Sequence, residues 1–285
     1  MLAVNHPNSF LDAIILCTLF DKSVYSLARG DAFKNKFFAK ILFLFKMFPV
    51  YRVSEGVENL EENYKTFELC KNIFKEKGIV LIFSEGRCIN EWHLRPLKKG
   101  TARLAISSWA EGIDVKILPV AINYSSFKRF GKNIKLYFGD IIHKKSFDYN
   151  DSYGNSIRQF NDTLNNELGK YVFEIDSADK KALHDKFYIR HSLIKKIVLF
   201  FPAVSGFLIH APFYLFIKWL GINVNKEPGH FDSKIVALLF VLYPVFLLLL
   251  SGLIFYFTGN LLSIFILVLL PFTAWAYVQI KKQLD

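Results

Sequence analysis

Residues 79–87 of the chain are Ile79-Val80-Leu81-Ile82-Phe83-Ser84-Glu85-Gly86-Arg87. The first part, Ile79–Phe83, is short, apolar and rich in β-branched residues, which is typical of a strand buried inside a sheet. Gly78 precedes it and ends a stretch of helical apolar spacing over 59–77. The strand therefore presents an acid, a glycine and a base on the loop at its carboxyl end, where open α/β sheets bind their ligands.

Strand and helix patterns alternate on both sides of this stretch. Short apolar runs predict strands at 2–4, 115–124 and 133–138, and helical periodicity predicts helices at 10–20, 59–77, 99–110 and 156–172. This alternation predicts an α/β fold over residues 1–190, with a central mixed sheet flanked by helices.

The C-terminal part of the chain is apolar enough to enter a membrane. Residues 235–257 and 261–280 contain no charged residue, and a helix needs about 20 apolar residues to cross a bilayer. Thr258-Gly259-Asn260 between them suits a tight turn, so we predict a transmembrane helical hairpin within 235–285. The segment 192–220 is also largely apolar, but it is interrupted by Pro202, Gly206, His210, Pro212 and Lys218.

Lysines indicate the orientation of this hairpin. They precede the first span and follow the second, so a hairpin places them all on one side of the membrane, which the positive-inside rule makes the cytoplasmic side. A third span over 192–220 would separate them, and we therefore expect 191–234 to be an interfacial or re-entrant segment. His210 lies among apolar residues there, and we expect it to hydrogen-bond a backbone carbonyl.

The composition narrows the possible partners. The chain has 285 residues, 52% of them hydrophobic, and a net charge of +11, which fits binding to nucleic acid, anionic lipid or a phosphorylated substrate. The basic residues lie beside long apolar runs and form no nucleic-acid-binding module, so we predict a membrane surface as partner and no nucleic acid.

The first motif begins directly after Met1, and we expect natural sequence to precede that residue.

The spacing of cysteines and histidines indicates no metal site. Cys17, Cys70 and Cys88 lie far apart without a C-x-x-C pair, so neither a disulfide framework nor zinc is indicated, and we expect buried thiols. The seven histidines show no H-E-x-x-H spacing, and we predict no metal. The sequence also lacks a G-x-S-x-G nucleophile elbow, and no cysteine lies in an obvious catalytic setting.

A candidate catalytic pair lies in Asn5-His6-Pro7-Asn8-Ser9-Phe10-Leu11-Asp12. His6 follows the predicted strand at 2–4, and Asp12 falls near the first turn of the next helix, where its carboxylate can reach the imidazole. Such a carboxylate fixes one histidine tautomer and stabilises the imidazolium that forms on proton abstraction. An isolated pair of this kind is more often a loop histidine and a helix-favouring acid.

The loop after the strand at 79–83 is a candidate substrate-binding element. Gly86 permits close backbone approach, Arg87 can hold phosphate through two hydrogen bonds, and Glu85 can hydrogen-bond substrate or orient the arginine. A surface turn with a Glu–Arg pair would give the same pattern.

Further basic residues suggest an anion-binding site. Arg52 follows a short apolar segment, and Lys98 and Lys99 lie at the start of a predicted helix, where phosphate is favoured. Solvated basic residues are common, so each of these signals is weak alone.

Four stretches of the chain, 5–12, 48–52, 83–87 and 118–122, resemble in this order the sequence blocks of the glycerolipid acyltransferase superfamily. The resemblance covers about the first 130 residues. Five residues separate His6 from Asp12 where the common motif has four, and Ser84 stands where a proline is usual; the pair matches a variant of one branch. The resemblance implies a catalytic acyltransferase domain over 1–190.

The resemblance also implies a reaction and a set of site residues. His6 and Asp12 would be catalytic, and substrate would be bound by Asn5, Arg52, Glu85, Gly86, Arg87, Lys98 and Lys99. The acyl group would pass directly from an acyl-CoA or acyl carrier protein thioester, without a cofactor, to 1-acyl-glycerol-3-phosphate in phospholipid biosynthesis. Glycerol 3-phosphate or another lysolipid is an alternative acceptor, and a lipid-binding membrane-surface protein without catalysis is an alternative function. We expect an integral membrane protein whose catalytic domain faces the cytoplasm.

Overall fold

The computed structural model describes residues 1–51, 60–147, 152–224 and 230–281. The chain divides into two compact units. Unit 1 contains Met1–Asn123 and Ile134–Ser177, and unit 2 contains Tyr124–Asn133 and Ala178–Asp285.

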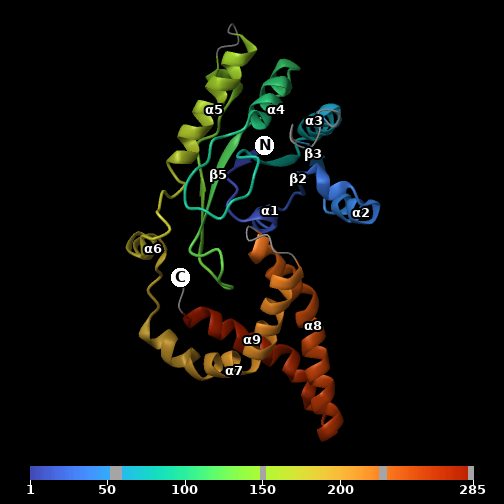
Figure 1. Cartoon of the computed structure of the whole chain (residues 1–285), viewed down its shortest axis with the longest axis vertical. Helices are drawn as coiled ribbons and strands as arrows, with labels where there is room; N and C mark the ends of the chain where they lie inside the picture. The colour runs from blue at the N-terminus through green and yellow to red at the C-terminus, as the bar shows by residue number, and fades with distance from the viewer. Residues whose placement is uncertain (52–59, 148–151, 225–229, 282–285) are drawn as a thin grey trace. The chain divides into compact units, whose positions relative to one another are not determined.

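A mixed sheet forms the centre of unit 1 (Figure 1). Its six strands in the described residues have the order β3-β2-β4-β1-β5-β6. Their bounds are β1 (Leu2–Val4), β2 (Val24–Arg29), β3 (Met47–Val50), β4 (Ile79–Phe83), β5 (Leu118–Tyr124) and β6 (Ile134–Phe138). The first five strands are parallel where they pair, and an antiparallel bridge between Ile117 and Ile142 indicates the reversed direction of β6. The short strand β1 lies between β4 and β5, with Leu2 opposite both Leu81 and Leu118.

Helices connect and cover these strands. They are α1 (Ser9–Cys17), α2 (Lys36–Leu44), α3 (Leu60–Lys75), α4 (Lys99–Ala110) and α5 (Tyr153–Gly169). The predicted α/β fold with a mixed sheet flanked by helices is confirmed, and β4 and α4 have the predicted bounds. The strands β2 and β3 and the helix α2 were not predicted. For α2 the reason is that apolar residues are almost continuous in 37–45 and show no clean period.

Side chains alternate between the two faces of the sheet. Ala3, Val80 and Ile82 belong to the main core cluster, together with the fully buried Trp109 of α4 and Phe160 of α5. Their strand neighbours point to the opposite face, as the two-residue period of a strand requires. The sheet therefore has two apolar faces, which is why its central strands have nearly continuous apolar sequences.

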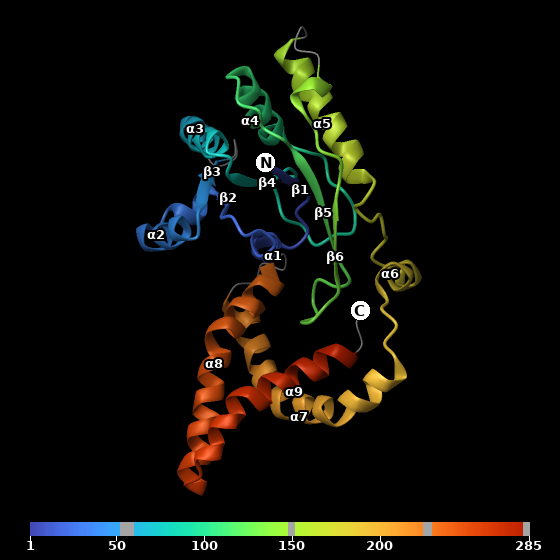
Figure 2. The same ribbon diagram turned by 180° about the vertical axis from the view of Figure 1, so that it is seen from behind.

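Unit 2 contains the segment Tyr124–Asn133 and the C-terminal helices (Figure 2). These helices are α6 (Lys180–Phe187), α7 (Leu193–Val224), α8 (Phe231–Thr258), the 3₁₀ helix η6 (Leu261–Phe265) and α9 (Ile266–Ile280). Gly259 has a left-handed φ of 62° and ends α8, as the predicted turn between two apolar helices requires. The C-terminal apolar helical hairpin is therefore present.

Three helical segments in the described residues are long and apolar enough to cross a membrane: Leu193–Asn223, Phe231–Thr258 and Leu261–Ile280. The first of these contains Pro202 and Pro212, which each remove a helical hydrogen bond and bend a helix. α7 accordingly changes direction along its length (Figure 2). The interfacial or re-entrant placement of 191–234 stays a prediction.

His210 links α7 to α8. Its Nδ1 lies 2.8 Å from the carbonyl oxygen of Gly206, and its Nε2 lies 3.0 Å from the hydroxyl oxygen of Tyr243. The expected hydrogen bond to a backbone carbonyl is therefore confirmed. Because a carbonyl only accepts, Nδ1 carries the proton that is shared with the Gly206 oxygen.

Candidate active site

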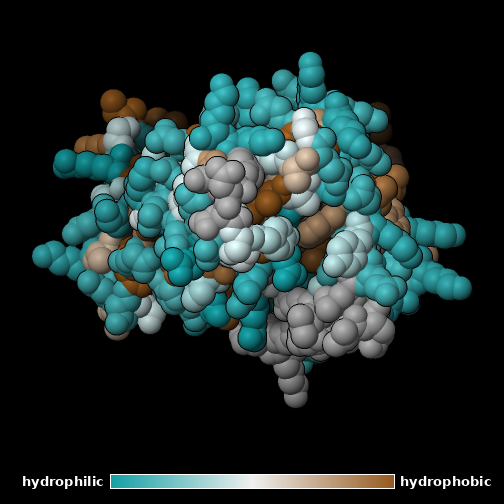
Figure 3. All heavy atoms as spheres, turned by 90° about the horizontal axis from the view of Figure 1, so that it is seen from above, coloured by the Kyte–Doolittle hydropathy of each residue, from teal (hydrophilic) through white to brown (hydrophobic). Residues whose placement is uncertain are grey.

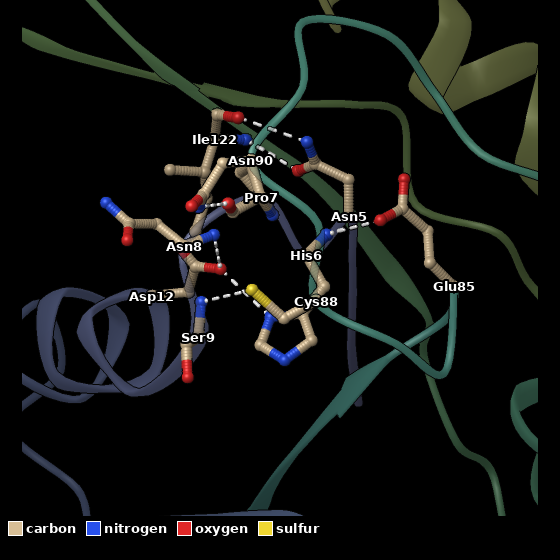
Figure 4. Close-up of polar contacts among 10 residues, drawn as sticks. All are labelled: Asn5, His6, Pro7, Asn8, Ser9, Asp12, Glu85, Cys88, Asn90 and Ile122. Atoms are coloured by element: carbon tan, nitrogen blue, oxygen red, sulfur yellow. Dashed lines mark hydrogen bonds and ion pairs between the residues drawn. The ribbon is translucent and has the colours of Figure 1, made fainter. Parts of the chain in front are cut away.

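The His6–Asp12 pair forms at the junction of β1 and α1 (Figure 4). His6 Nδ1 lies 2.9 Å from Asp12 Oδ2, and the same oxygen accepts a hydrogen bond of 2.8 Å from the backbone N–H of Asn8. The Asp12 side chain is fully buried. A carboxylate in this position places the proton of a neutral imidazole on Nδ1, so that Nε2 presents its lone pair.

The His6 ring is fixed on a second side by Phe83, the last residue of β4. The two rings stack with centroids 3.9 Å apart and an angle of 13° between their planes. The His6 side chain is 17% exposed, and Figure 4 shows its second ring nitrogen pointing away from Asp12. The imidazole is thus held in one orientation and remains reachable, which a general base requires.

Glu85 joins the loop after β4 to the loop after β1. Its Oε2 accepts the His6 backbone N–H at 2.9 Å, and its Oε1 accepts the Arg95 backbone N–H at 3.0 Å. The side chain is only 4% exposed. Both carboxylate oxygens therefore hold backbone at the site, and a direct contact of Glu85 with substrate stays a prediction.

Three more hydrogen bonds connect the same loops. Ser84 N–H donates to Val4 O at 2.8 Å, Ile89 N–H donates to His6 O at 3.3 Å, and the Asn90 side chain donates to Pro7 O at 2.7 Å. The backbone around His6 is thus bonded to the loop that follows β4 on both sides of the histidine. The position of His6 depends on residues that lie more than 70 positions later in the sequence.

Burial raises the pKa of Glu85, although the N–H donors of Arg95 and His6 oppose that shift. The ordinary pKa is 4.5. Above that value the folded state binds more protons than the unfolded state, so the free energy of unfolding falls as pH rises. This contribution is fully present below the ordinary pKa and is lost as pH rises through the pKa of the folded state.

Glu85→Gln should therefore flatten part of the pH dependence of stability. We expect the unfolding free energy of wild type to fall relative to that of Glu85→Gln as pH rises from about 4 to about 8, since glutamine does not titrate in that range. Thermal unfolding of both proteins in one detergent, at a series of pH values, measures this difference. A difference that stays constant with pH would contradict the assignment.

Asn5 is bound to the neighbouring strand β5. Its side-chain nitrogen donates to Ile122 O at 3.0 Å, and its side-chain oxygen accepts the Ile122 N–H at 2.8 Å. The side chain is buried and continues the pairing of β1 with β5 by one residue. The structure thus places Asn5 next to His6 as a residue that fixes the loop, and contact with substrate stays a prediction.

The remaining predicted binding residues have different surroundings. Gly86 has a left-handed φ of 65°, and a Cβ there would lie 2.9 Å from Lys98 Cγ, so Gly86 and Lys98 are neighbours. Lys98 also donates its N–H to Ser84 O at 2.7 Å. The side chains of Lys98, Lys99 and Arg87 are exposed. Arg52 lies outside the described residues.

Cys88 lies at the site, although its spacing from the other cysteines did not indicate this position. Its sulfur accepts the Ser9 N–H, and Figure 4 shows it close to the His6–Asp12 pair. Burial and the nearby carboxylate of Asp12 raise the pKa of the Cys88 thiol to about 12, and Glu85 adds to the shift. The thiol therefore stays protonated at neutral pH. The sequence signal for this position was that Cys88 follows β4 on the same loop as Glu85.

The structure thus defines an α/β protein with a carboxylate-held histidine at the carboxyl edge of a mixed sheet. Residues 1–123 match the family model described as Acyltransferase. The resemblance inferred from the four sequence blocks is confirmed. The match supports acyl transfer in glycerolipid synthesis as the general activity. No curated protein matches the chain.

Proposed function

We propose that this protein transfers a fatty acyl group from an acyl-CoA or acyl carrier protein thioester to the free hydroxyl of 1-acyl-glycerol-3-phosphate. The observation that carries the proposal is the 2.9 Å contact between His6 Nδ1 and the buried Asp12 carboxylate. This contact leaves Nε2 as a base within the part of the chain that matches the acyltransferase family model.

The reaction proceeds by direct attack. His6 Nε2 takes the proton of the acceptor hydroxyl while its oxygen forms a bond to the thioester carbonyl carbon. The carbon–sulfur bond then breaks, and the departing thiolate takes the proton from the imidazolium. Asp12 stabilises the imidazolium between these two steps, because its carboxylate is held close to Nδ1.

A phosphate-bearing acceptor is favoured by the basic residues at the site. The exposed side chains of Arg87, Lys98 and Lys99 belong to the loop after β4 and the start of α4. The loop is bonded to the backbone on both sides of His6. We propose that these residues, together with Arg52, bind the phosphate of the acceptor, through charge-assisted hydrogen bonds.

The apolar C-terminal helices support a membrane location. We propose that they anchor the protein in the bilayer, where an acylated acceptor resides, and that the catalytic domain faces the cytoplasm. The second part rests on the lysines that flank the two C-terminal spans.

The test is acyl transfer by the full chain in detergent or bilayers. Labelled acyl-CoA and acyl carrier protein are each combined with 1-acyl-glycerol-3-phosphate, glycerol 3-phosphate and lysophosphatidylcholine. We expect transfer to 1-acyl-glycerol-3-phosphate. Transfer to glycerol 3-phosphate alone would replace the proposed acceptor, and lipid binding without transfer to any acceptor would favour the non-catalytic alternative.

Cys88 provides a test of direct transfer against a covalent acyl-enzyme. A nucleophilic cysteine acts as thiolate, and the environment of Cys88 keeps it protonated. We expect Cys88→Ser to retain transfer within a few-fold, because a serine oxygen can still accept the Ser9 N–H. Initial rates of wild type and variant measure this, with Cys17→Ser as the control for loss of a cysteine elsewhere. A loss as large as that of His6→Ala would instead indicate an acyl-cysteine intermediate.

A further inference from the structure

The crossover helix α2 of unit 1 has an unusual surface. It begins after Asn35, whose side-chain oxygen accepts the backbone N–H groups of Phe37 and Phe38 as a helix N-cap. None of its residues is buried. The surrounding segment is Lys34-Asn35-Lys36-Phe37-Phe38-Ala39-Lys40-Ile41-Leu42-Phe43-Leu44-Phe45-Lys46.

Large apolar side chains form one exposed stripe on α2. Phe37, Ile41 and Leu44 follow each other at helical spacing, and Phe38 and Phe45 lie beside them. Four of these five side chains are between 57% and 78% exposed, and Ile41 is partly buried. On another side of the helix, Phe43 is 49% exposed, and its ring contacts Phe33 and Phe48. The stripe therefore points away from the domain.

Another part of the surface of unit 1 differs from this stripe. The end that carries α4 and α5 shows mainly hydrophilic residues (Figure 3). Clustered exposed aromatic side chains usually mark a surface that binds a protein or a membrane.

The charges around the stripe favour a membrane as its partner. Lys34, Lys36, Lys40 and Lys46 lie within the segment, and no acidic residue occurs between 32 and 46. Lys36 and Lys40 are one turn apart and lie beside the stripe. An exposed aromatic stripe bordered by lysines is the pattern of a helix that lies in a bilayer interface, where lysines contact anionic headgroups.

The strand that precedes α2 relates this surface to the site. β2 pairs in parallel with β4, and β4 pairs in parallel with β1. The carboxyl end of β2, from which the chain continues into α2, therefore lies at the same edge of the sheet as His6 and Glu85. Leu44 and Phe45 lead into β3, which is parallel to β2, and so lie toward the other edge. A membrane contact through the first turn of α2 would hold the His6 edge of the catalytic unit next to the bilayer.

We propose that α2 inserts its stripe (Phe37, Phe38, Ile41, Leu44 and Phe45) into the headgroup–acyl boundary of an anionic bilayer. Lys36 and Lys40 bind lipid phosphates beside it. The stripe is a second membrane contact of the chain, separate from the three apolar helices at the C-terminus. This proposal does not depend on the reaction catalysed at His6.

Photocrosslinking in the full chain tests the proposal. p-Benzoylphenylalanine is placed at Leu44 or at Phe38, both exposed, so that the core is not disturbed. Asn166, an exposed residue of α5, is the matched control in the same unit, and Phe240 of α8 is the reference for lipid contact. The protein is reconstituted in vesicles of phosphatidylcholine with or without phosphatidylglycerol, illuminated, and analysed for adducts by mass spectrometry.

We expect phospholipid adducts at positions 38, 44 and 240 and none at 166. Replacing Lys36 and Lys40 with glutamine should lower the yield at 44 about fivefold for each lysine in vesicles with phosphatidylglycerol, and hardly in phosphatidylcholine alone. Adducts at 240 without adducts at 38 and 44 would overturn the insertion. Adducts from 44 to a second copy of the chain would overturn it in favour of self-association. An unchanged yield in the lysine variant would overturn the electrostatic part.

Discussion

His6→Ala is expected to lower the rate of acyl transfer by about 10²–10⁴-fold, because it removes the group that takes the acceptor's proton. The loss should fall on kcat, since the imidazole acts in the transition state while the acceptor's phosphate is bound by other residues. Initial rates with labelled thioester and the preferred acceptor measure it. His184→Ala, which replaces an exposed histidine of α6, is the matched control and should retain the wild-type rate.

Stability must be compared in the same experiment. The His6 ring stacks on Phe83, so its removal also takes away packing at the end of β4. A loss of activity accompanied by an unchanged melting temperature assigns the effect to chemistry. Unchanged activity in His6→Ala would remove the proposed mechanism entirely.

Asp12→Asn is expected to reduce kcat by up to about 10⁴-fold, the loss produced by the equivalent change in a Ser-His-Asp triad. The oxygen Oδ2 of Asp12 accepts from both His6 Nδ1 and the Asn8 N–H. An asparagine whose oxygen takes the place of Oδ2 still accepts from the Asn8 N–H and from Nδ1, whereas the flipped amide presents its NH₂ group to both. A donor facing Nδ1 moves the ring proton to Nε2, so the imidazole can no longer act as base.

Comparison of two substitutions separates the tautomer from the charge. Asp12→Asn and Asp12→Ala both remove the negative charge, but only the asparagine can donate a hydrogen bond to Nδ1. We expect the asparagine variant to be at least as inactive as the alanine variant, and Asp185→Asn in the exposed part of α6 to keep full activity. Kinetics of the four proteins with one acceptor test this. An asparagine variant close to wild type would show that Asp12 has only a structural role.

Several elements of unit 1 could be predicted because their local sequence agrees with their burial. Ile79–Phe83 is apolar throughout and is buried on both faces of the sheet, so a continuous apolar run predicted it correctly. α4 combines a regular apolar spacing with a fully buried Trp109. The segment that contains α2 could not be predicted in this way, because its apolar side chains are exposed and no core selects their period.

The candidate site was predicted in part for similar reasons. His6 and Asp12 lie within a few residues of each other, so their contact follows from a strand that leads into a helix. The contacts of Asn5 with Ile122 and of Glu85 with the His6 backbone cross 117 and 79 positions. Such contacts are set by strand order, which no local pattern contains. The proximity of Cys88 to the His6–Asp12 pair depends on the same strand order.

The central position of β1 in the sheet affects when unit 1 can fold during synthesis of the chain. This strand has only three residues, Leu2–Val4, and its two neighbours begin at Ile79 and Leu118. Contacts across such separations form slowly, because the intervening chain must first be ordered. The N-terminal histidine loop therefore waits for β5 to be synthesised before it can be fixed. Unit 1 is complete at Ser177, ahead of the first membrane-length helix at Leu193. A slowly assembling catalytic unit is thus translated in full before the three apolar helices.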